Sequence, residues 1–328
     1  VRTLLSPIAS RRRSTRSFSD ERLPMRFTIF QDSKIGGRKV NQDRLAYSYY
    51  KDTLLMVIAD GLGGYARGEI AAEIAVNTLN HRFQAEARTV LQRPREFLES
   101  AVHAAHRAIV AFADKHDLLE CPRTTIVAVI LQNGIAQWAH VGDSRLYYFR
   151  SGRLATATQD HSRVQQMVEA GVITSEQAAV HPDRNKIYNC LGGVIPPTIA
   201  HSDEWKLQVG DSIWISTDGF WGPLSAAEIA TRLSTENILS LAPKLMEEAE
   251  DKAGAESDNL SVVALTWEMQ DEDLSTAVDD GTVTIPMAGF SSTMNTTHEF
   301  AAAKDEISDD EIERTIAEIQ NAIKRVNR

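Results

Sequence analysis

Five aspartates border apolar runs of the sequence, at positions where they could share one site. Asp60, Asp143 and Asp218 each follow such a run, whereas Asp43 and Asp258 each precede one. An Asp-Gly pair, which two of these positions form, is by itself a common hairpin turn. Several strand-terminal carboxylates indicate more than turns, because the strands of one sheet deliver their ends to the same region.

Carboxylates gathered in this way need cations. Two of them ~5 Å apart repel by roughly 3 kcal/mol at an effective dielectric of ~20. Several such repulsions together would exceed the free energy of unfolding that a typical domain can lose. Ligand sets of oxygen alone favour Mg²⁺ or Mn²⁺, with waters completing the octahedron. Asp60, Asp218 and Asp258 would leave two such ions with net positive charge, able to accept a phosphate dianion. Arg38 lies near Asp43 in the sequence, and its guanidinium suits bidentate phosphate binding.

The elements that must position these residues come in groups. Strand-like runs, rich in β-branched and aromatic residues, cover residues 27–30, 45–50, 53–59, 125–131, 135–141, 144–150, 199–207, 211–216 and 260–267. Helical patterns cover residues 68–83, 94–116, 160–170, 225–233 and 239–253. This is not the strict alternation of a parallel sheet. It predicts an α+β fold of packed antiparallel sheets with helices outside.

Composition divides the chain into four parts. Residues 1–24 are rich in Arg and Ser and are predicted to be a basic, disordered extension, with a transit peptide as the alternative. Residues 25–268 carry the strand and helix patterns and form the predicted globular domain. Residues 269–307 are polar and acidic, which is typical of a linker. Residues 308–328 begin with a capping-box pattern and continue with Ile and Val at helical spacing, so a short amphipathic helix that docks on its own domain or on a partner is expected.

The bulk properties exclude several classes of protein. The 328 residues carry a net charge of −10, which argues against non-specific nucleic-acid binding. No uninterrupted apolar run approaches the ~18 residues of a membrane span. Two cysteines form neither a disulfide framework nor a zinc cage, and a reducing, cytoplasmic location is expected.

Two competing motifs fail on their context. Residues 61–66 match the dinucleotide pattern G-x-G-x-x-A, but residues 78–88 do not form the second buried strand that this motif requires. A cysteine phosphatase needs an arginine soon after its nucleophile. The sixth residue after Cys121 is Val127, and the sixth after Cys190 is Pro196. Neither cysteine therefore fits that chemistry.

A series of short segments resembles the metal-dependent protein phosphatases of type 2C, the PPM family, and especially their compact bacterial members. The segments are R-K-V-N-Q-D at 38–43, A-D-G-L-G-G at 59–64, T-T at 124–125, V-G-D-S-R at 141–145, Q-D-H-S at 159–162, L-G-G at 191–193, S-T-D-G at 216–219 and S-D-N-L-S at 257–261. They occur in the order of the family and cover residues 25–268. The joint match is highly specific, although each segment alone is not.

The resemblance implies a central β-sandwich of two antiparallel sheets flanked by pairs of helices, with a binuclear Mn²⁺ or Mg²⁺ site at one edge. By the same resemblance Asp60 bridges both ions and Gly61 offers its backbone carbonyl. Asp218 and Asp258 bind the first ion, and Asp43 acts on the second through water.

Two further roles follow from the resemblance. Asp143, together with Asp218, binds a third and weaker ion, and Arg38 holds the phosphate. Residues 163–190 form a flap beside the site. The implied activity is hydrolysis of phosphoserine and phosphothreonine in proteins by a metal-activated bridging water, without a covalent intermediate. The implied partners are phosphorylated proteins that a Ser/Thr kinase targets, in bacterial signalling.

Departures from the family pattern leave alternatives open. Position 62 is Leu62, where some members carry a histidine proposed as general acid, so a third-metal water and His161 are the candidates. Position 42 is Gln42, where others carry Glu, so weaker binding of the second ion is expected. The alternative functions are a catalytically impaired phosphatase fold that serves as a regulatory or binding module, and a small-molecule phosphohydrolase.

Overall fold

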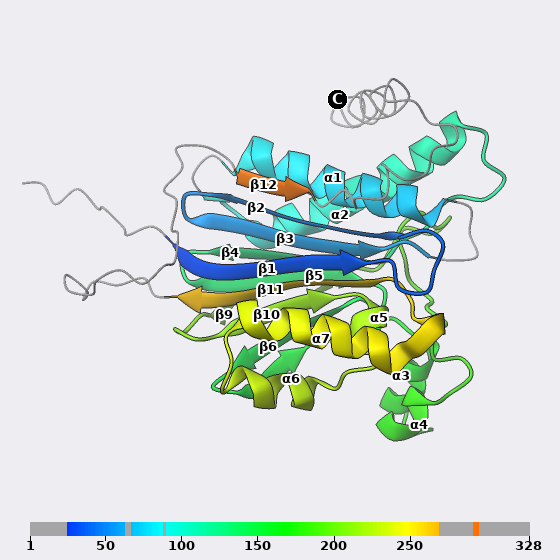
Figure 1. The fold of residues 1–328 in the computed structure, drawn as a ribbon. Helices are drawn as coiled ribbons and strands as arrows, with labels where there is room; N and C mark the ends of the chain where they lie inside the picture. Colours follow the sequence, from blue (N-terminus) through cyan, green and yellow to red (C-terminus); the bar gives the residue numbers. More distant parts are fainter. Residues whose placement is uncertain (1–24, 63–66, 88–89, 269–290, 295–328) are drawn as a thin grey trace, which may run out of the picture.

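Two antiparallel sheets stack face to face, and helices cover both outer faces (Figure 1). The structure is a computed structural model that describes residues 25–62, 67–87, 90–268 and 291–294. The first sheet has the strand order β1-β11-β10-β6-β7. Its strands are β1 (Arg26–Lys34), β6 (Arg145–Arg150), β7 (Arg153–Ala157), β10 (Ser212–Ser216) and β11 (Leu260–Glu268).

The second sheet has the order β12-β2-β3-β4-β5-β8, and β9 also pairs with β5. Its strands are β2 (Asp43–Tyr50), β3 (Thr53–Asp60), β4 (Ile126–Gln132), β5 (Ile135–Val141), β8 (Ala200–His201), β9 (Trp205–Lys206) and β12 (Ser291–Met294). Together the two sheets confirm the predicted sandwich.

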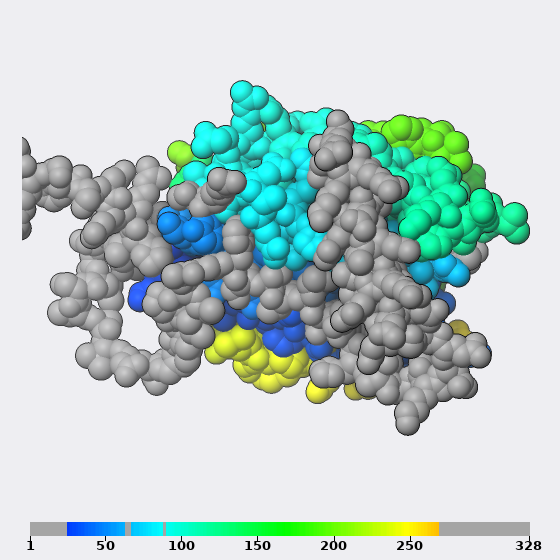
Figure 2. Space-filling model, turned by 90° about the horizontal axis from the view of Figure 1, so that it is seen from above, coloured from blue at the N-terminus to red at the C-terminus, as the bar shows by residue number. Residues whose placement is uncertain are grey.

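A pair of long helices, α1 (Gly68–Glu86) and α2 (Pro94–Lys115), covers the outer face of the second sheet, as the cyan atoms in Figure 2 show. The first sheet is covered by α5 (Asp218–Trp221), α6 (Ala226–Leu233) and α7 (Ile238–Ala253), with a 3₁₀ turn at Gly254–Glu256. Two short helices, α3 (Arg163–Glu169) and α4 (Ser175–Ala179), lie at one end of the sandwich. Among the described helices, none has the length and apolar character to cross a membrane.

Strand alternation divides the core into three layers. In β3, Leu55 and Val57 face α1 and α2, whereas Leu54 and Met56 face the other sheet, and all four side chains are fully buried. In β10, Trp214 points to the helices on the opposite side. Because each such side chain contributes about 1.5–3 kcal/mol on burial, this apolar run on both faces is what fixes β3 in the middle of the sandwich.

The register brings the predicted site residues to one edge. Asp43 opens β2 and lies directly opposite Asp60, which closes β3. Strands β10 and β11 are antiparallel, so Asp218 after β10 and Asp258 before β11 reach that edge together. Asp143 lies in the turn from β5 to β6. Five residues that are distant in sequence therefore meet for a reason of topology.

The structure differs from the sequence predictions at several places. The predicted strand 199–207 is two short strands. It is interrupted because Ser202, which lies between them, donates its N–H to the Trp138 carbonyl and accepts at its hydroxyl from the Trp138 N–H. Strand β12 lies inside the segment predicted as linker, so that prediction is wrong for these four residues. The predicted extension 1–24 and the predicted helix 308–328 lie outside the described residues.

Candidate metal and phosphate site

Asp43 is the most enclosed of the predicted ligands, with 1% of the residue exposed. Its Oδ2 accepts a hydrogen bond from the Thr217 hydroxyl at 2.8 Å. Among the described residues its Oδ1 has no hydrogen-bond partner. Burial raises the pKa of Asp43 to about 7, although the hydroxyls of Ser261 and Thr217 act in the opposite direction. A buried oxygen of this kind is suited to a ligand that the chain itself does not supply.

Asp60 is held by its backbone, which leaves its carboxylate free for other partners. Its N–H donates to the Thr125 hydroxyl at 3.0 Å, and its carbonyl accepts from the Thr124 hydroxyl at 2.8 Å. The next residue, Gly61, donates its N–H to the Gln42 carbonyl at 3.1 Å. A Cβ at Gly61 would lie 2.4 Å from the backbone of Gly68, so only glycine allows α1 to begin here. Burial and then the charge of Asp43 raise the pKa of Asp60 well above its usual range.

Asp218 stands at the start of α5. A Cβ on its neighbour Gly219 would lie 2.2 Å from the Asn259 carbonyl, so this glycine permits the close approach that brings Asp218 beside Asp258. Burial, followed by the charge of Asp258, raises the pKa of Asp218 to about 6, whereas the Gly219 N–H and Arg38 oppose the shift.

Asp143 belongs to the same electrostatic cluster. Only 6% of the residue is exposed. Burial raises its pKa well above the usual range, and the charges of Asp218 and Asp160 add to the effect. The charges of Asp43, Asp218, Asp143 and Asp258 likewise raise the pKa of Asp60. The structure thus brings all five predicted carboxylates close enough to interact electrostatically.

Arg38 provides the positive charge at the solvent side of this cluster. Its Nη2 lies 2.7 Å from Asp258 Oδ2, and the two side chains are 55% and 35% exposed. The hydrogen bond to Asp258 raises the pKa of Arg38 further above its usual value. The guanidinium is therefore anchored at one nitrogen, and it borders solvent where a substrate would arrive.

The donor set fits divalent ions with oxygen ligands. Within the described ranges, no three His, Cys, Asp or Glu side chains lie close enough together to hold one ion by themselves. Mg²⁺ keeps several waters in its coordination shell, so some of these carboxylates can act on an ion through water. The buried, unpaired Oδ1 of Asp43 and the repulsion between the carboxylates both favour a bound cation at this edge.

Two departures from the family pattern acquire a structural context. The Gln42 side chain donates to Glu69 of α1 at 3.3 Å, which places a carboxylate beside the position where relatives carry Glu. His161 accepts at Nδ1 from the Gly142 N–H at 3.2 Å and lies 2.7 Å from Asn189 Nδ2. Burial, followed by the nearby His140, lowers the pKa of His161 to about 4, so its ring is neutral at pH 7 and a poor general acid.

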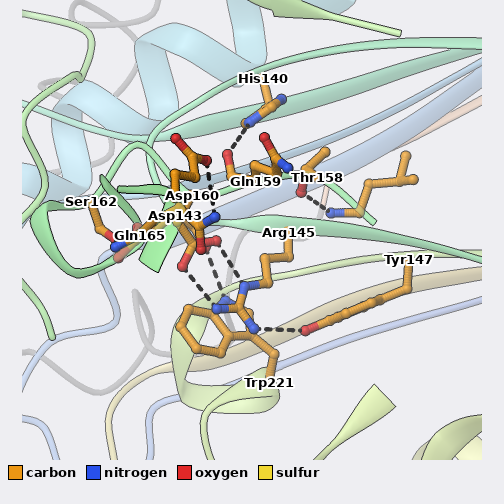
Figure 3. A network of polar contacts seen from close by, with 12 residues as sticks. His140, Asp143, Arg145, Tyr147, Thr158, Gln159, Asp160, Ser162, Gln165 and Trp221 are labelled. Carbon is orange, nitrogen blue, oxygen red and sulfur yellow. Dashed lines mark hydrogen bonds and ion pairs between the residues drawn. The ribbon is translucent and has the colours of Figure 1, made fainter. Parts of the chain in front are cut away.

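Sequence reasoning missed a second set of residues at this edge. Figure 3 shows Arg145, Asp160, Tyr147 and Trp221 in contact around the Asp143 turn. Arg145 and Asp160 lie in two of the family segments, V-G-D-S-R and Q-D-H-S, but their types alone assigned them no role. No sequence pattern indicated a role for Trp221, because the hydrogen bond from its indole to Asp143 depends on the fold.

Known proteins resemble this chain in sequence and in fold. The family described as protein phosphatase 2C matches residues 30–261. The serine/threonine protein phosphatase PstP of Mycobacterium tuberculosis is 33% identical over 217 residues, which are 66% of this chain and 41% of PstP. The chain thus spans less than half the length of that relative.

Solved structures agree. The serine/threonine phosphatase of S. agalactiae has a TM-score of 0.67 and 31% identity, covering 74% of this chain and 100% of that one. The catalytic domain of PstP in complex with two manganese ions has a TM-score of 0.62 and 29% identity, covering 75% of this chain and 99% of that one. By its sequence, its fold and its edge of buried aspartates, this chain belongs to the protein phosphatase 2C family.

Proposed function

We propose that this chain hydrolyses phosphoserine and phosphothreonine in proteins, with two Mn²⁺ or Mg²⁺ ions at the edge where β2, β3, β10 and β11 end. Asp60 would serve both ions, assisted by the Gly61 carbonyl, with Asp218 and Asp258 on the first and Asp43 on the second. Asp143 with Asp218 would hold a third, weaker ion. The observation that carries the proposal is the convergence of five buried or half-buried carboxylates beside Arg38.

Ions bound there supply Lewis-acid stabilisation and lower the pKa of water. The chain itself contributes position and charge. Thr217 orients Asp43 by its hydrogen bond, and Thr124 and Thr125 fix the backbone of Asp60. Arg38 lies at the solvent side, where its free nitrogens can bind the equatorial oxygens of a phosphoryl group as their charge develops.

The partners would be phosphorylated proteins, the targets of a Ser/Thr kinase. Half-exposure of Arg38 supports a large substrate, because a phosphorylated side chain can reach it without leaving its own protein surface. A cytoplasmic location is part of the proposal. The C-terminal segment that docks on its own domain or on a partner also remains a prediction.

Hydrolysis of a phosphothreonine peptide and of p-nitrophenyl phosphate tests this function. We expect turnover of the peptide with Mn²⁺, no turnover with excess EDTA, and loss of turnover in Asp218→Asn with Mn²⁺ present. A chain that cleaves only the small phosphoester would be a small-molecule phosphohydrolase. A folded chain inert with both ions would be a regulatory or binding module, and either result contradicts the proposal.

A further inference from the structure

A second arginine lies beside the proposed ion site, and its bonding differs from that of Arg38. The Arg145 fork binds Asp160 through both carboxylate oxygens, each at 2.8 Å. Its Nη1 donates to the Tyr147 hydroxyl at 3.1 Å, and its guanidinium carbon lies 3.4 Å from the centroid of the Trp221 ring. Because its fork is committed to Asp160, Arg145 does not compete with Arg38 for phosphate.

Trp221 links Arg145 to the proposed ion site, because it contacts both Arg145 and the Asp143 turn. Its Nε1 donates to the backbone carbonyl of Asp143 at 3.1 Å. Trp221 also closes the short helix α5, which begins at Asp218. Figure 3 shows the indole stacked against the Arg145 guanidinium, with its Nε1 directed toward Asp143. Through Trp221 and Asp160, the Arg145 guanidinium therefore connects the Asp143 turn, the end of helix α5 and the segment that leads to α3.

The charge at this place also calls for a cation. Asp160 is a third carboxylate near Asp143 and Asp218, and its side chain is only 8% exposed. Without Arg145 it would repel both of them across a poorly solvated region. Arg145 reduces that repulsion while it fixes Asp160, so its geometric and electrostatic effects act in the same direction.

We propose that Arg145 is a positioning residue for the proposed ion site, because its contacts with Trp221 and Asp160 hold helix α5, which begins at Asp218, against the Asp143 turn. Arg145 acts through Trp221 and Asp160 and touches no substrate. This role rests on the proposed function, since Asp143 and Asp218 are the ligands that it would position.

The chain offers a matched control on the same strand. Arg150, at the other end of β6, makes the same kind of fork with the buried Asp211, with distances of 2.9 and 2.8 Å, and contacts the Tyr148 hydroxyl at 2.7 Å. In the register of β6 and β10, Arg145 lies opposite Ser216, near Asp218, and the Arg150 end lies beyond Ser212. Loss of either fork costs stability, but only one fork lies at the ion site.

The test compares Arg145→Lys, Arg150→Lys and Trp221→Phe with the wild type. Lysine keeps the charge and loses the fork and the stack, whereas phenylalanine keeps a ring for the stack and loses the Nε1 donor. Three quantities are measured: Mn²⁺ affinity by titration calorimetry, kcat and KM on a phosphothreonine peptide, and hydrogen exchange of residues 142–145 and 218–222 in EDTA.

We expect Arg145→Lys to weaken Mn²⁺ binding and to lower kcat by about 10–100-fold, the range for groups that support metal ligands, with little change in KM. Its exchange in both segments rises even without metal. Trp221→Phe shows a smaller loss of the same kind. Arg150→Lys lowers thermal stability but keeps the wild-type Mn²⁺ affinity and kcat.

Wild-type Mn²⁺ affinity in Arg145→Lys would contradict the positioning role. An equal loss of Mn²⁺ affinity in Arg145→Lys and Arg150→Lys would also contradict it, because this would show a general effect of stability. If Arg145→Lys does not fold, Trp221→Phe decides, because wild-type affinity and exchange in that variant contradict the contact to Asp143. A wild type that binds no Mn²⁺ overturns the proposed function and this role together. A wild type that binds Mn²⁺ while the variants match it overturns this role alone.

Discussion

At the scale of single residues, the two arginines beside the carboxylates divide their tasks by exposure. Arg38 is anchored at one nitrogen to Asp258 and borders solvent, so its other donors are available to a phosphate. Arg145 is committed to Asp160 and Trp221. In our proposals, arginine thus serves phosphate recognition at position 38 and positioning at position 145, and the neighbouring residues decide which role it takes.

Arg38→Ala should lower kcat/KM on a phosphothreonine peptide by about 10–150-fold, because a hydrogen bond to a charged group contributes about 1.5–3 kcal/mol. Steady-state kinetics with saturating Mn²⁺ measures the loss. Arg93→Ala is the control, since Arg93 forms an exposed pair with Glu96 at 2.9 Å on the surface. Equal kcat/KM in Arg38→Ala and wild type would remove Arg38 from the site.

Asp43 provides a prediction about metal removal. Burial raises its pKa to about 7 in the folded chain, above the ~3.9 of an unfolded aspartate. A raised pKa contributes stability at low pH, and this contribution is lost as the pH rises through the interval from about 4 to 7. Asp43→Asn stays neutral, and it should therefore unfold at a higher temperature than the wild type in EDTA at pH 8.

The difference should shrink toward pH 4, where both side chains are neutral. With Mn²⁺ present the order should reverse, because only the wild type gains the full stabilisation of the bound ion. Thermal unfolding from pH 4 to 8, with EDTA and with Mn²⁺, measures both effects. An Asp43→Asn variant that is less stable than the wild type at every pH in EDTA would mean that Asp43 is a structural acceptor only.

At the scale of elements, the sequence predicted those whose pattern is local. The core strands and the helices α1, α2, α6 and α7 follow from periodicity, because each presents a long apolar face to a sheet. The short elements β7, α4 and α5 did not follow, since few apolar side chains mark them. Strand β12 exists through backbone pairing with β2, which composition does not reveal.

The candidate site divides in the same way. The aspartates were predictable, because acidic residues that border apolar runs are visible in the sequence. The contacts of Arg145 with Asp160 and Trp221 were not, because they join residues from three loops and elements that only the fold brings together. Cysteine chemistry was excluded by spacing alone. The role of Arg38 depends on Asp258, which lies 220 residues away.

His161 gives an element-scale prediction for the segment that contains α3 and α4. Its neutral Nδ1 accepts from the Gly142 N–H and is close to Asn189 Nδ2, so it connects both ends of that segment to the β5–β6 turn. Its pKa is lowered to about 4, below the ~6.5 of an unfolded histidine. This contribution to stability is complete above pH 6.5 and is lost as the pH falls toward 4.

Urea unfolding from pH 4 to 6.5 in EDTA should show that the wild type loses more stability on acidification than His161→Gln. The excess slope corresponds to at most one additional proton bound on unfolding. Parallel pH profiles for the wild type and His161→Gln would show that the ring is not a neutral acceptor.

At the scale of the whole molecule, β12 is the part of the chain after residue 268 that the structure describes, and it pairs with the sandwich. Strand β12 pairs antiparallel with β2, with Ser291 opposite Tyr49 and Met294 opposite Ala46. Strand β2 begins with Asp43, yet the pairing lies farther along it, away from the ion site. Strand β12 therefore contacts the edge of the sheet and not the residues of the proposed site.

A chain that ends at residue 268 and one that ends at residue 294 separate these effects. Both should bind Mn²⁺ and dephosphorylate the peptide at the wild-type rate, because all proposed ligands precede residue 268. Only the shorter chain exposes the unpaired N–H and C=O groups of β2, which invite pairing with other molecules. It should unfold at a lower temperature and form more aggregates in light scattering, whereas the longer chain should match the wild type. A shorter chain that stays folded and monomeric but loses most of its turnover would instead assign the C-terminal segment a part in catalysis.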